Sequence, residues 1–199
     1  MSFNKKGYKI IRNAISKELA KISYNYLLIK RNAIAYMLEN KYLPPFDTMH
    51  GTWNDGQQPD TYSIYGDPLM ETLLLYLKPT MKKETKLNLY ETYAYARTYK
   101  QNDVLKKHKD RFSCEVSTTI RLGGKDWPLF LRDGKKIIRV DLNDGDMLIY
   151  RGNELVHWRE ALDGDVAVNV FLHYSVNKDL LNDGRPMLGL SGNVKNAKK

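Results

Sequence analysis

The chain has 199 residues, of which 42% are hydrophobic and 28% are charged, the composition of an ordinary folded domain. It contains no run of about 18 apolar residues, which excludes a membrane-spanning helix, and its single cysteine excludes a disulfide framework or a cysteine-rich zinc site. The formal net charge of +9 sits at the two ends, because residues 1–41 carry +7, residues 193–199 carry +3 and residues 42–192 carry −1.

This charge distribution bears on partners and location. A nucleic-acid groove would place the basic excess around the reactive centre, so nucleic acid is not the favoured partner. Residues 1–6 have no apolar block behind their charges, and we therefore expect no secretory signal. Together with the single cysteine, this predicts a reducing, cytoplasmic location without membrane attachment. The pattern leaves the oligomeric state open.

Residues 1–40 are predicted to form a strand and a helix. Residues 8–11 favour the short strand. Ser16 is a suitable N-cap for the helix, and Glu18 lies in its first turn, where the helix dipole stabilises an acid. Apolar residues at helical spacing follow, which indicates a scaffold helix with a solvated, lysine-rich outer face.

Residues 41–67 are rich in glycine, proline and aspartate, which predicts a long loop. Loops of this length in compact domains are commonly functional. We therefore expect a lid or a substrate-recruiting element, with Trp53 and Tyr62 as its aromatic residues. A second helix is predicted over residues 68–86, because Pro68 suits the first helical position.

From residue 87 the hydrophobic period changes to two, which indicates strands. Strands are predicted at residues 90–99, 115–122, 128–131, 137–140, 146–150, 155–159 and 166–174. Many short strands with glycine and aspartate turns, and no helix between them, argue for a barrel or jelly roll over residues 87–177. Residues 1–177 are expected to be one domain and residues 178–199 a C-terminal extension with a disordered end.

The histidines provide a candidate metal site. His108 and Asp110 lie two residues apart, so on an extended segment both side chains point the same way. His157 lies on a separate predicted strand that a jelly roll can bring alongside. Two imidazoles and one carboxylate on one face of a metal suit non-haem Fe(II) and its reactions with oxygen. The alternative is that residues 106–111 are a solvated charge run and that His157 is an ordinary core histidine.

The surrounding motifs resemble a known family, the prolyl 4-hydroxylase class of 2-oxoglutarate/Fe(II) dioxygenases. The resemblance rests on Tyr95-Ala96-Arg97-Thr98-Tyr99, His108-Lys109-Asp110, the Gly145-Asp146 strand, His157 and a closing strand at 168–174. Marine-phage members look closer still, on His108 to Glu115, Tyr150-Arg151-Gly152, His157-Trp158-Arg159 and Gly51-Thr52-Trp53. The resemblance extends over nearly the whole chain up to residue 177.

The resemblance implies an α+β fold whose core is a double-stranded β-helix of the jelly-roll or cupin-like kind, with the N-terminal helices packed on one sheet. It implies that residues 1–177 form one catalytic domain. It also implies that His108, Asp110 and His157 are the catalytic residues and hold Fe(II), with 2-oxoglutarate and O2 as cosubstrates. For a viral protein, the expected location is the host cytoplasm.

The sequence departs from the family at the anchor for the distal carboxylate of 2-oxoglutarate. Relatives place a basic residue nine or ten positions after the second histidine, where this chain has Val166 and Ala167. Arg159 is our first replacement, because it lies two residues after that histidine and points the same way along the strand. Arg121 is the second. The alternative for Arg159 is an exposed partner of Glu160.

Three further residues are candidate cosubstrate contacts. Tyr99 occupies the position of a family tyrosine that contacts 2-oxoglutarate, although it could equally be a cross-strand packing aromatic. Asn169 and His173 share the strand parity of Ala167, which predicts that they lie in the same pocket, although a core histidine is the favoured interpretation of His173. Cys114 is expected to be a small buried side chain.

The resemblance implies hydroxylation of a protein or peptide side chain, with proline as the first choice and succinate as the cosubstrate product. Two other functions remain open. One is oxidative demethylation or hydroxylation of a nucleobase or small molecule, which for a nucleobase would need stacking aromatic residues and a basic rim at the pocket mouth. The other is a non-catalytic jelly-roll binding module.

Overall fold

The computed structural model describes residues 3–178, which form two antiparallel sheets and three helices. The larger sheet has the strand order β1-β9-β6-β11-β4-β3-β2, and the smaller has the order β5-β10-β7-β8. The strands are β1 (Tyr8–Ile11), β2 (Thr52–Asp55), β3 (Gln58–Tyr65), β4 (Tyr90–Lys100), β5 (Leu105–His108), β6 (Val116–Gly124), β7 (Leu129–Asp133), β8 (Lys136–Val140), β9 (Met147–Tyr150), β10 (His157–Arg159) and β11 (Val166–Ser175).

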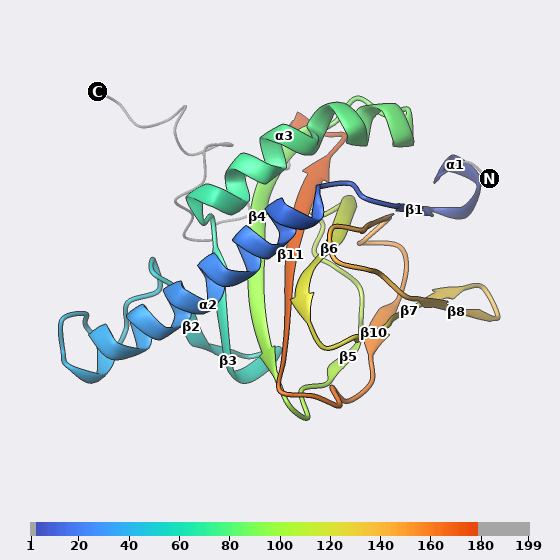
Figure 1. Ribbon diagram of the computed structural model, residues 1–199. Helices are drawn as coiled ribbons and strands as arrows, with labels where there is room; N and C mark the ends of the chain where they lie inside the picture. The colour runs from blue at the N-terminus through green and yellow to red at the C-terminus, as the bar shows by residue number, and fades with distance from the viewer. Residues whose placement is uncertain (1–2, 179–199) are drawn as a thin grey trace, which may run out of the picture.

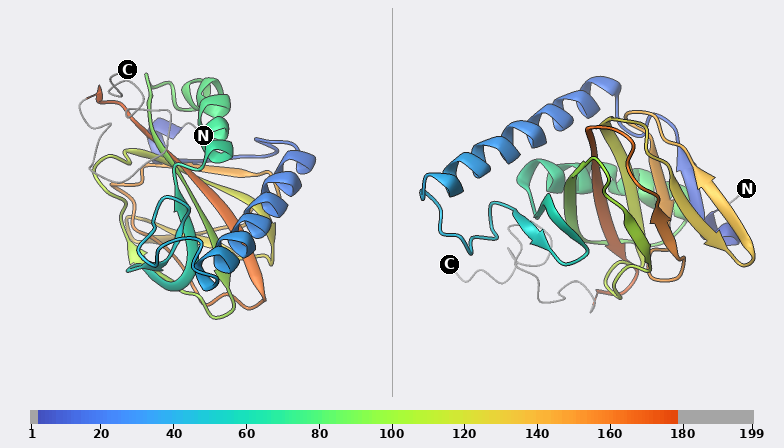
Figure 2. Two further views of the ribbon diagram at one scale, coloured as in Figure 1. Left: turned by 90° about the vertical axis from the view of Figure 1, so that its left-hand side faces the viewer. Right: turned by 90° about the horizontal axis from the view of Figure 1, so that it is seen from below.

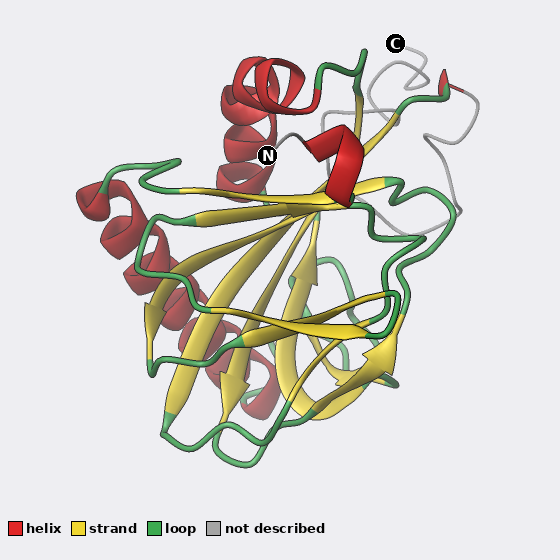
Figure 3. Cartoon of the chain, turned by 90° about the vertical axis from the view of Figure 1, so that its right-hand side faces the viewer, coloured by secondary structure: helices red, strands yellow, loops and turns green. Residues whose placement is uncertain are grey.

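The helices are α1 (Phe3–Lys6), α2 (Lys17–Glu39) and α3 (Pro68–Thr85). Helices α2 and α3 cover the outer face of the larger sheet (Figures 1 and 2). Figure 3 shows the two sheets in a view turned by 90° from that of Figure 1. Helices on one face of two packed antiparallel sheets confirm the α+β class and the jelly-roll-like core. The finer winding of a double-stranded β-helix stays a prediction.

Most residues of β4, an inner strand of the larger sheet, are buried, because both faces of the strand are covered. Ala94 and Ala96 belong to the hydrophobic cluster shared with the helices, whereas Tyr93, Tyr95 and Tyr99 belong to a second cluster between the sheets. Small residues therefore face the helices and large aromatic residues face the inter-sheet space, as strand alternation requires. That inter-sheet space contains the functional site.

The expected long loop over residues 41–67 is only partly a loop. It contains the hairpin formed by β2 and β3 at the edge of the larger sheet, with residues 62–65 of β3 paired to residues 95–98 of β4. The lid role expected for Tyr62 is wrong: its ring is 1% exposed, and its hydroxyl donates to the His50 carbonyl at 2.7 Å. Trp53 packs on Tyr62, with the ring centroids 4.8 Å apart.

The predicted disorder at residues 191–199 lies outside the described residues. Over residues 3–178, none of the helices combines the length and the apolar character needed to cross a membrane.

Asp67 joins α2 to α3 and is completely buried. As the N-cap of α3 it accepts hydrogen bonds from the backbone N–H groups of Leu69 (3.0 Å) and Met70 (3.2 Å). Its other oxygen accepts a hydrogen bond from the Tyr26 hydroxyl at 2.8 Å and forms an ion pair with Lys30 of α2. One carboxylate thus begins one helix and holds the other against it.

Asp67→Ala is expected to lower the free energy of unfolding by about 3–5 kcal/mol, because it removes one partner of a buried ion pair as well as a helix cap. Urea denaturation followed by circular dichroism measures this loss. Asp141→Ala is the matched control, since Asp141 is an exposed partner of Arg139 and its loss should be much smaller. Equal losses in the two variants would contradict the role given to Asp67.

Candidate metal centre

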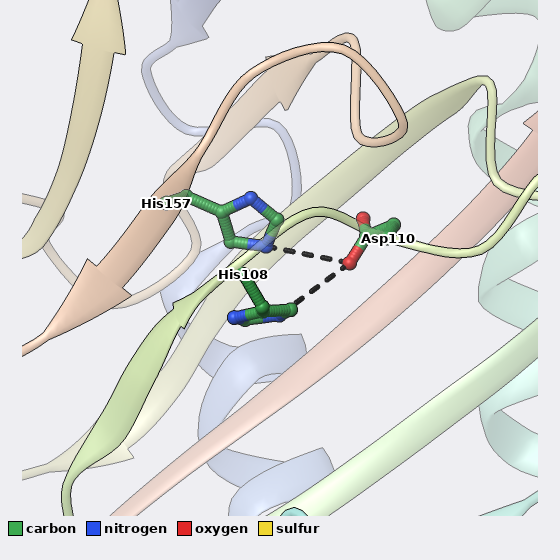
Figure 4. A group of neighbouring side chains, drawn as sticks. All are labelled: His108, Asp110 and His157. Carbon is green, nitrogen blue, oxygen red and sulfur yellow. Dashed lines mark ion pairs between the residues drawn. The ribbon is translucent and has the colours of Figure 1, made fainter.

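Three side chains, two from strands and one from the segment that follows β5, converge on one point between the sheets (Figure 4). His108 at the end of β5 lies directly across from His157 at the start of β10, because the two strands pair in antiparallel register there. The Oδ1 atom of Asp110 lies 3.7 Å from Nε2 of His108 and 3.3 Å from Nε2 of His157. One ligand atom from each residue lies within 4.8 Å of the other two, so the three can share a single metal ion.

Backbone carbonyls orient both imidazoles. Nδ1 of His108 lies 2.8 Å from the Lys106 carbonyl, and Nδ1 of His157 lies 2.9 Å from the Leu155 carbonyl. A carbonyl only accepts, so each Nδ1 carries a proton and donates it, and Nε2 is the ring nitrogen that faces Asp110. Burial, followed by the neighbouring His157, lowers the pKa of His108, which favours the neutral imidazole that a metal requires.

Asp110 is held by two hydrogen bonds, to Gly152 and from Ser117, that leave its Oδ1 atom available. Its backbone N–H donates to the Gly152 carbonyl at 2.8 Å. Its Oδ2 atom accepts a hydrogen bond from the Ser117 hydroxyl at 2.6 Å. The Ser117 hydroxyl oxygen in turn lies 3.0 Å from Nδ1 of His173. Burial acts to raise the pKa of Asp110, but His157, His173 and Ser117 outweigh it and hold the pKa well below its usual range. The carboxylate is therefore ionised and oriented.

Gly152 is required by this packing. A Cβ atom at residue 152 would lie 2.3 Å from Oδ2 of Asp110 and 2.3 Å from the Ser117 hydroxyl oxygen. Neither atom can move without changing the carboxylate orientation. Any larger residue at this position would therefore displace the hydrogen bond that holds Asp110.

The triad lines a cavity of about 410 Å³, within the size range of small-molecule sites. Alternate side chains of β4 form one wall, namely Tyr93, Tyr95, Arg97 and Tyr99. The turn between β2 and β3, residues 55–57, also lines the cavity. This turn and Tyr65 of β3, rather than Trp53 and Tyr62, are the parts of the 41–67 segment that line the cavity.

Arg159, at the end of β10, is a buried cation without an acidic partner in the described structure. Arg159 is 2% exposed. One Nη atom donates a hydrogen bond to the Trp127 carbonyl. The Nε atom and the second Nη atom have no hydrogen-bond partner among residues 3–178. Burial lowers the pKa of Arg159 to about 10, while Tyr99 and Tyr150 act in the opposite direction. Ala167 lines the same small cavity, as expected for a side chain that leaves room for the guanidinium.

The structure therefore does not make Arg159 an exposed partner of Glu160. The group that donates to the Glu160 carboxylate is the indole N–H of Trp158, at 2.8 Å. Arg121, the second anchor candidate, already has acidic partners: Nε donates to Asp144 at 2.7 Å, and Nη1 forms an ion pair with Asp126. Neither arginine lines the metal cavity, and both line the small cavity beside Ala167, so the two candidates differ in their acidic partners.

The other candidate residues are distributed between two places. Tyr99 lines the metal cavity and packs its ring edge-on against Trp127 at 4.7 Å, so both predicted roles are compatible with its position. Asn169 lies beside Arg159 in the small cavity. His173 lines the metal cavity and contacts Ser117, which places it next to a partner of Asp110.

Ser117 was not among the residues predicted from the sequence. A serine on a strand has no spacing that distinguishes it, and its importance arises from β6 packing beside the Asp110 carboxylate. Gly152 could have been noticed as part of the Tyr150-Arg151-Gly152 turn, although the reason for a glycine there needs the structure.

No family model matches this sequence, and no curated protein matches it. Solved structures do. A prolyl-4-hydroxylase from Pseudomonas putida matches with a TM-score of 0.57 at 14% identity, over 86% of this chain and 94% of that one. The viral collagen prolyl hydroxylase from Paramecium bursaria Chlorella virus-1, in a 2-oxoglutarate complex, matches with a TM-score of 0.60 at 8% identity, over 86% and 97%.

HygX from Streptomyces hygroscopicus, with nickel and 2-oxoglutarate bound, matches with a TM-score of 0.61 at 13% identity, over 87% of this chain and 84% of HygX. At these identities the comparisons establish a shared fold. The chain thus has the architecture found in 2-oxoglutarate-binding proteins that act on, or bind, quite different molecules.

Ser117→Ala should weaken binding of a divalent metal about 10- to 100-fold, because groups that orient a metal ligand have effects of this size. Titration with Co(II), followed by its visible absorption, measures the affinity. Ser23→Ala is the control, since Ser23 is also buried but lies on α2. Unchanged affinity in Ser117→Ala would show that the hydroxyl does not orient Asp110.

Proposed function

We propose that the protein is a 2-oxoglutarate- and Fe(II)-dependent dioxygenase that hydroxylates a protein or peptide side chain, with proline as the first choice. The observation that carries this proposal is the convergence of two imidazole nitrogens and one carboxylate oxygen on one point of a cavity. Such a set occupies one face of a metal and leaves other positions open, as non-haem Fe(II) oxygenases require.

The donor chemistry fits the proposed metal. His108, Asp110 and His157 would hold Fe(II) through Nε2, Oδ1 and Nε2. When bound, the metal and 2-oxoglutarate would supply the oxidation of a substrate C–H bond by O2, with succinate and carbon dioxide as the cosubstrate products. The protein orients the donors through Lys106, Leu155 and Ser117, whose contacts are independent of the metal.

Arg159 fits the distal carboxylate of 2-oxoglutarate. A buried guanidinium with two unpaired N–H positions is unfavourable unless an anion joins it, and a carboxylate accepts from such a fork in two parallel hydrogen bonds. Tyr99 and Asn169 lie close by to complete a cosubstrate site, whereas His173 is better placed to support Asp110. The anchor thus comes from β10 rather than from β11, where relatives have it.

Substrate class is the finer part of the proposal. The prolyl hydroxylases among the structural neighbours support proline by likeness of fold, and the aromatic wall of the cavity suits its ring. Hydroxylation of a small molecule or nucleobase is the alternative, and HygX has also been solved with hygromycin B bound. The resemblance to marine-phage members of the family and the cytoplasmic location both stay predictions.

Wild-type protein supplied with Fe(II), 2-oxoglutarate and O2 should form succinate, and His108→Ala and Asp110→Ala should each abolish it, because two donors hold Fe(II) poorly. Succinate measured by mass spectrometry is the readout. His50→Ala serves as the control, since His50 is an exposed histidine outside the cavity. Succinate formation at the wild-type rate in either triad variant would contradict the assignment of the metal ligands.

Arg159→Ala should raise the KM for 2-oxoglutarate about 30-fold or more, because losing one partner of a buried charge pair costs about 2–5 kcal/mol. Arg159→Lys should recover part of that loss. Arg121→Ala should leave the KM near its wild-type value, since its guanidinium is held by Asp144 and Asp126. Steady-state kinetics with varied 2-oxoglutarate measure these KM values. A larger rise in KM for Arg121→Ala than for Arg159→Ala would assign the anchor to Arg121.

A further inference from the structure

Two cationic residues that have no ion-pair partner in the described structure are among those that line the metal cavity. Lys109 and Arg111 flank Asp110 on the segment that follows β5, and both are exposed. Neither forms an ion pair or a side-chain hydrogen bond within residues 3–178. Their charges are therefore free to meet an incoming group.

The other charges of the cavity are already neutralised. Asp55 and Asp110 are the only acids that line it in the described structure. Asp55 accepts from Nη2 of Arg97 at 2.7 Å and from the Tyr95 hydroxyl at 2.7 Å, so these two side chains satisfy it. Asp110 belongs to the metal centre. Lys109 and Arg111 thus leave the outer part of the cavity with excess positive charge.

An aromatic wall lies in the same cavity. Phe171 packs on Tyr95 with ring centroids 5.8 Å apart, Tyr95 on Tyr65 at 4.3 Å, and Tyr65 on Tyr93 at 5.7 Å. All four residues line the cavity. A continuous surface of this kind packs well against the ring of proline, as aromatic-lined grooves do when they bind proline-containing peptides.

We propose that the substrate is a peptide segment in which an acidic residue flanks the oxidised ring. The ring would lie against the aromatic wall while the acidic side chain pairs with Lys109 and Arg111. This inference rests on the proposed oxygenase function and specifies its substrate. A nucleic-acid strand would need a longer basic track for successive phosphates, whereas residues 42–192 carry a net charge of −1.

The test uses an equimolar library of capped peptides with a central proline, whose two flanking residues are drawn from Asp, Glu, Asn, Gln, Lys and Arg. Mass spectrometry measures the +16 Da product of each member. Wild-type enzyme should oxidise acidic members about 3- to 10-fold faster than their amide counterparts, the range expected for exposed charge pairs. That preference should shrink at high ionic strength.

Charge reversal provides the decisive comparison. The double variant Lys109→Glu with Arg111→Glu should favour lysine- and arginine-flanked peptides, and the double variant to Gln should lose the preference. Reversing Lys135 and Lys136, two exposed lysines near the β7–β8 turn, should leave the wild-type preference intact. The KM for 2-oxoglutarate, measured alongside, shows whether the metal centre has been disturbed.

Equal oxidation of acidic and amide peptides, or a preference that survives charge reversal, would overturn the inference. So would the absence of any oxidised peptide, or oxidation of a single-stranded oligonucleotide instead. These results differ from failure of the proposed function, which would appear as no succinate from wild-type enzyme under any condition.

Discussion

The antiparallel pairing of β5 with β10 is the constraint on which the site depends. It sets His108 across from His157, and Asp110 follows two residues later on an extended segment, so three donors meet without a long side chain having to reach. A register shift of one residue would turn an imidazole to the opposite face of the sheet. Strand geometry, rather than side-chain adjustment, therefore determines the donor set.

The larger sheet supports donors that the smaller sheet supplies. Ser117 on β6 holds the Asp110 carboxylate, and His173 on β11 lies against Ser117. Gly152, in the turn after β9, leaves the space in which that carboxylate sits. Because these contacts cross from one sheet to the other, the site exists only when the two sheets are packed together.

Structural features that depend on residues close together in the sequence were predicted well. Alternation after residue 87 indicated the strands because aromatic and small residues face different layers, and the His108–Asp110 spacing indicated the metal centre. The parity of Arg159 with His157 placed it on the inner face, where it is buried. Contacts between distant segments were not predictable. The β2–β3 hairpin was not predicted because its many turn-forming residues indicated a loop. The hydrogen bond between Asp55 and Arg97 was not predictable because it joins residues 42 positions apart.

The isolation of the Arg159 guanidinium also has a consequence for the stability of the fold. A cation enclosed in this way opposes folding, and any dicarboxylate that pairs with it binds the native chain but not the unfolded one, so folding and ligand concentration are thermodynamically linked. If a cellular dicarboxylate occupies this site, a fall in its supply would increase the fraction of opened molecules that proteases can reach. The abundance of this protein would then follow the metabolic state of the cell that contains it.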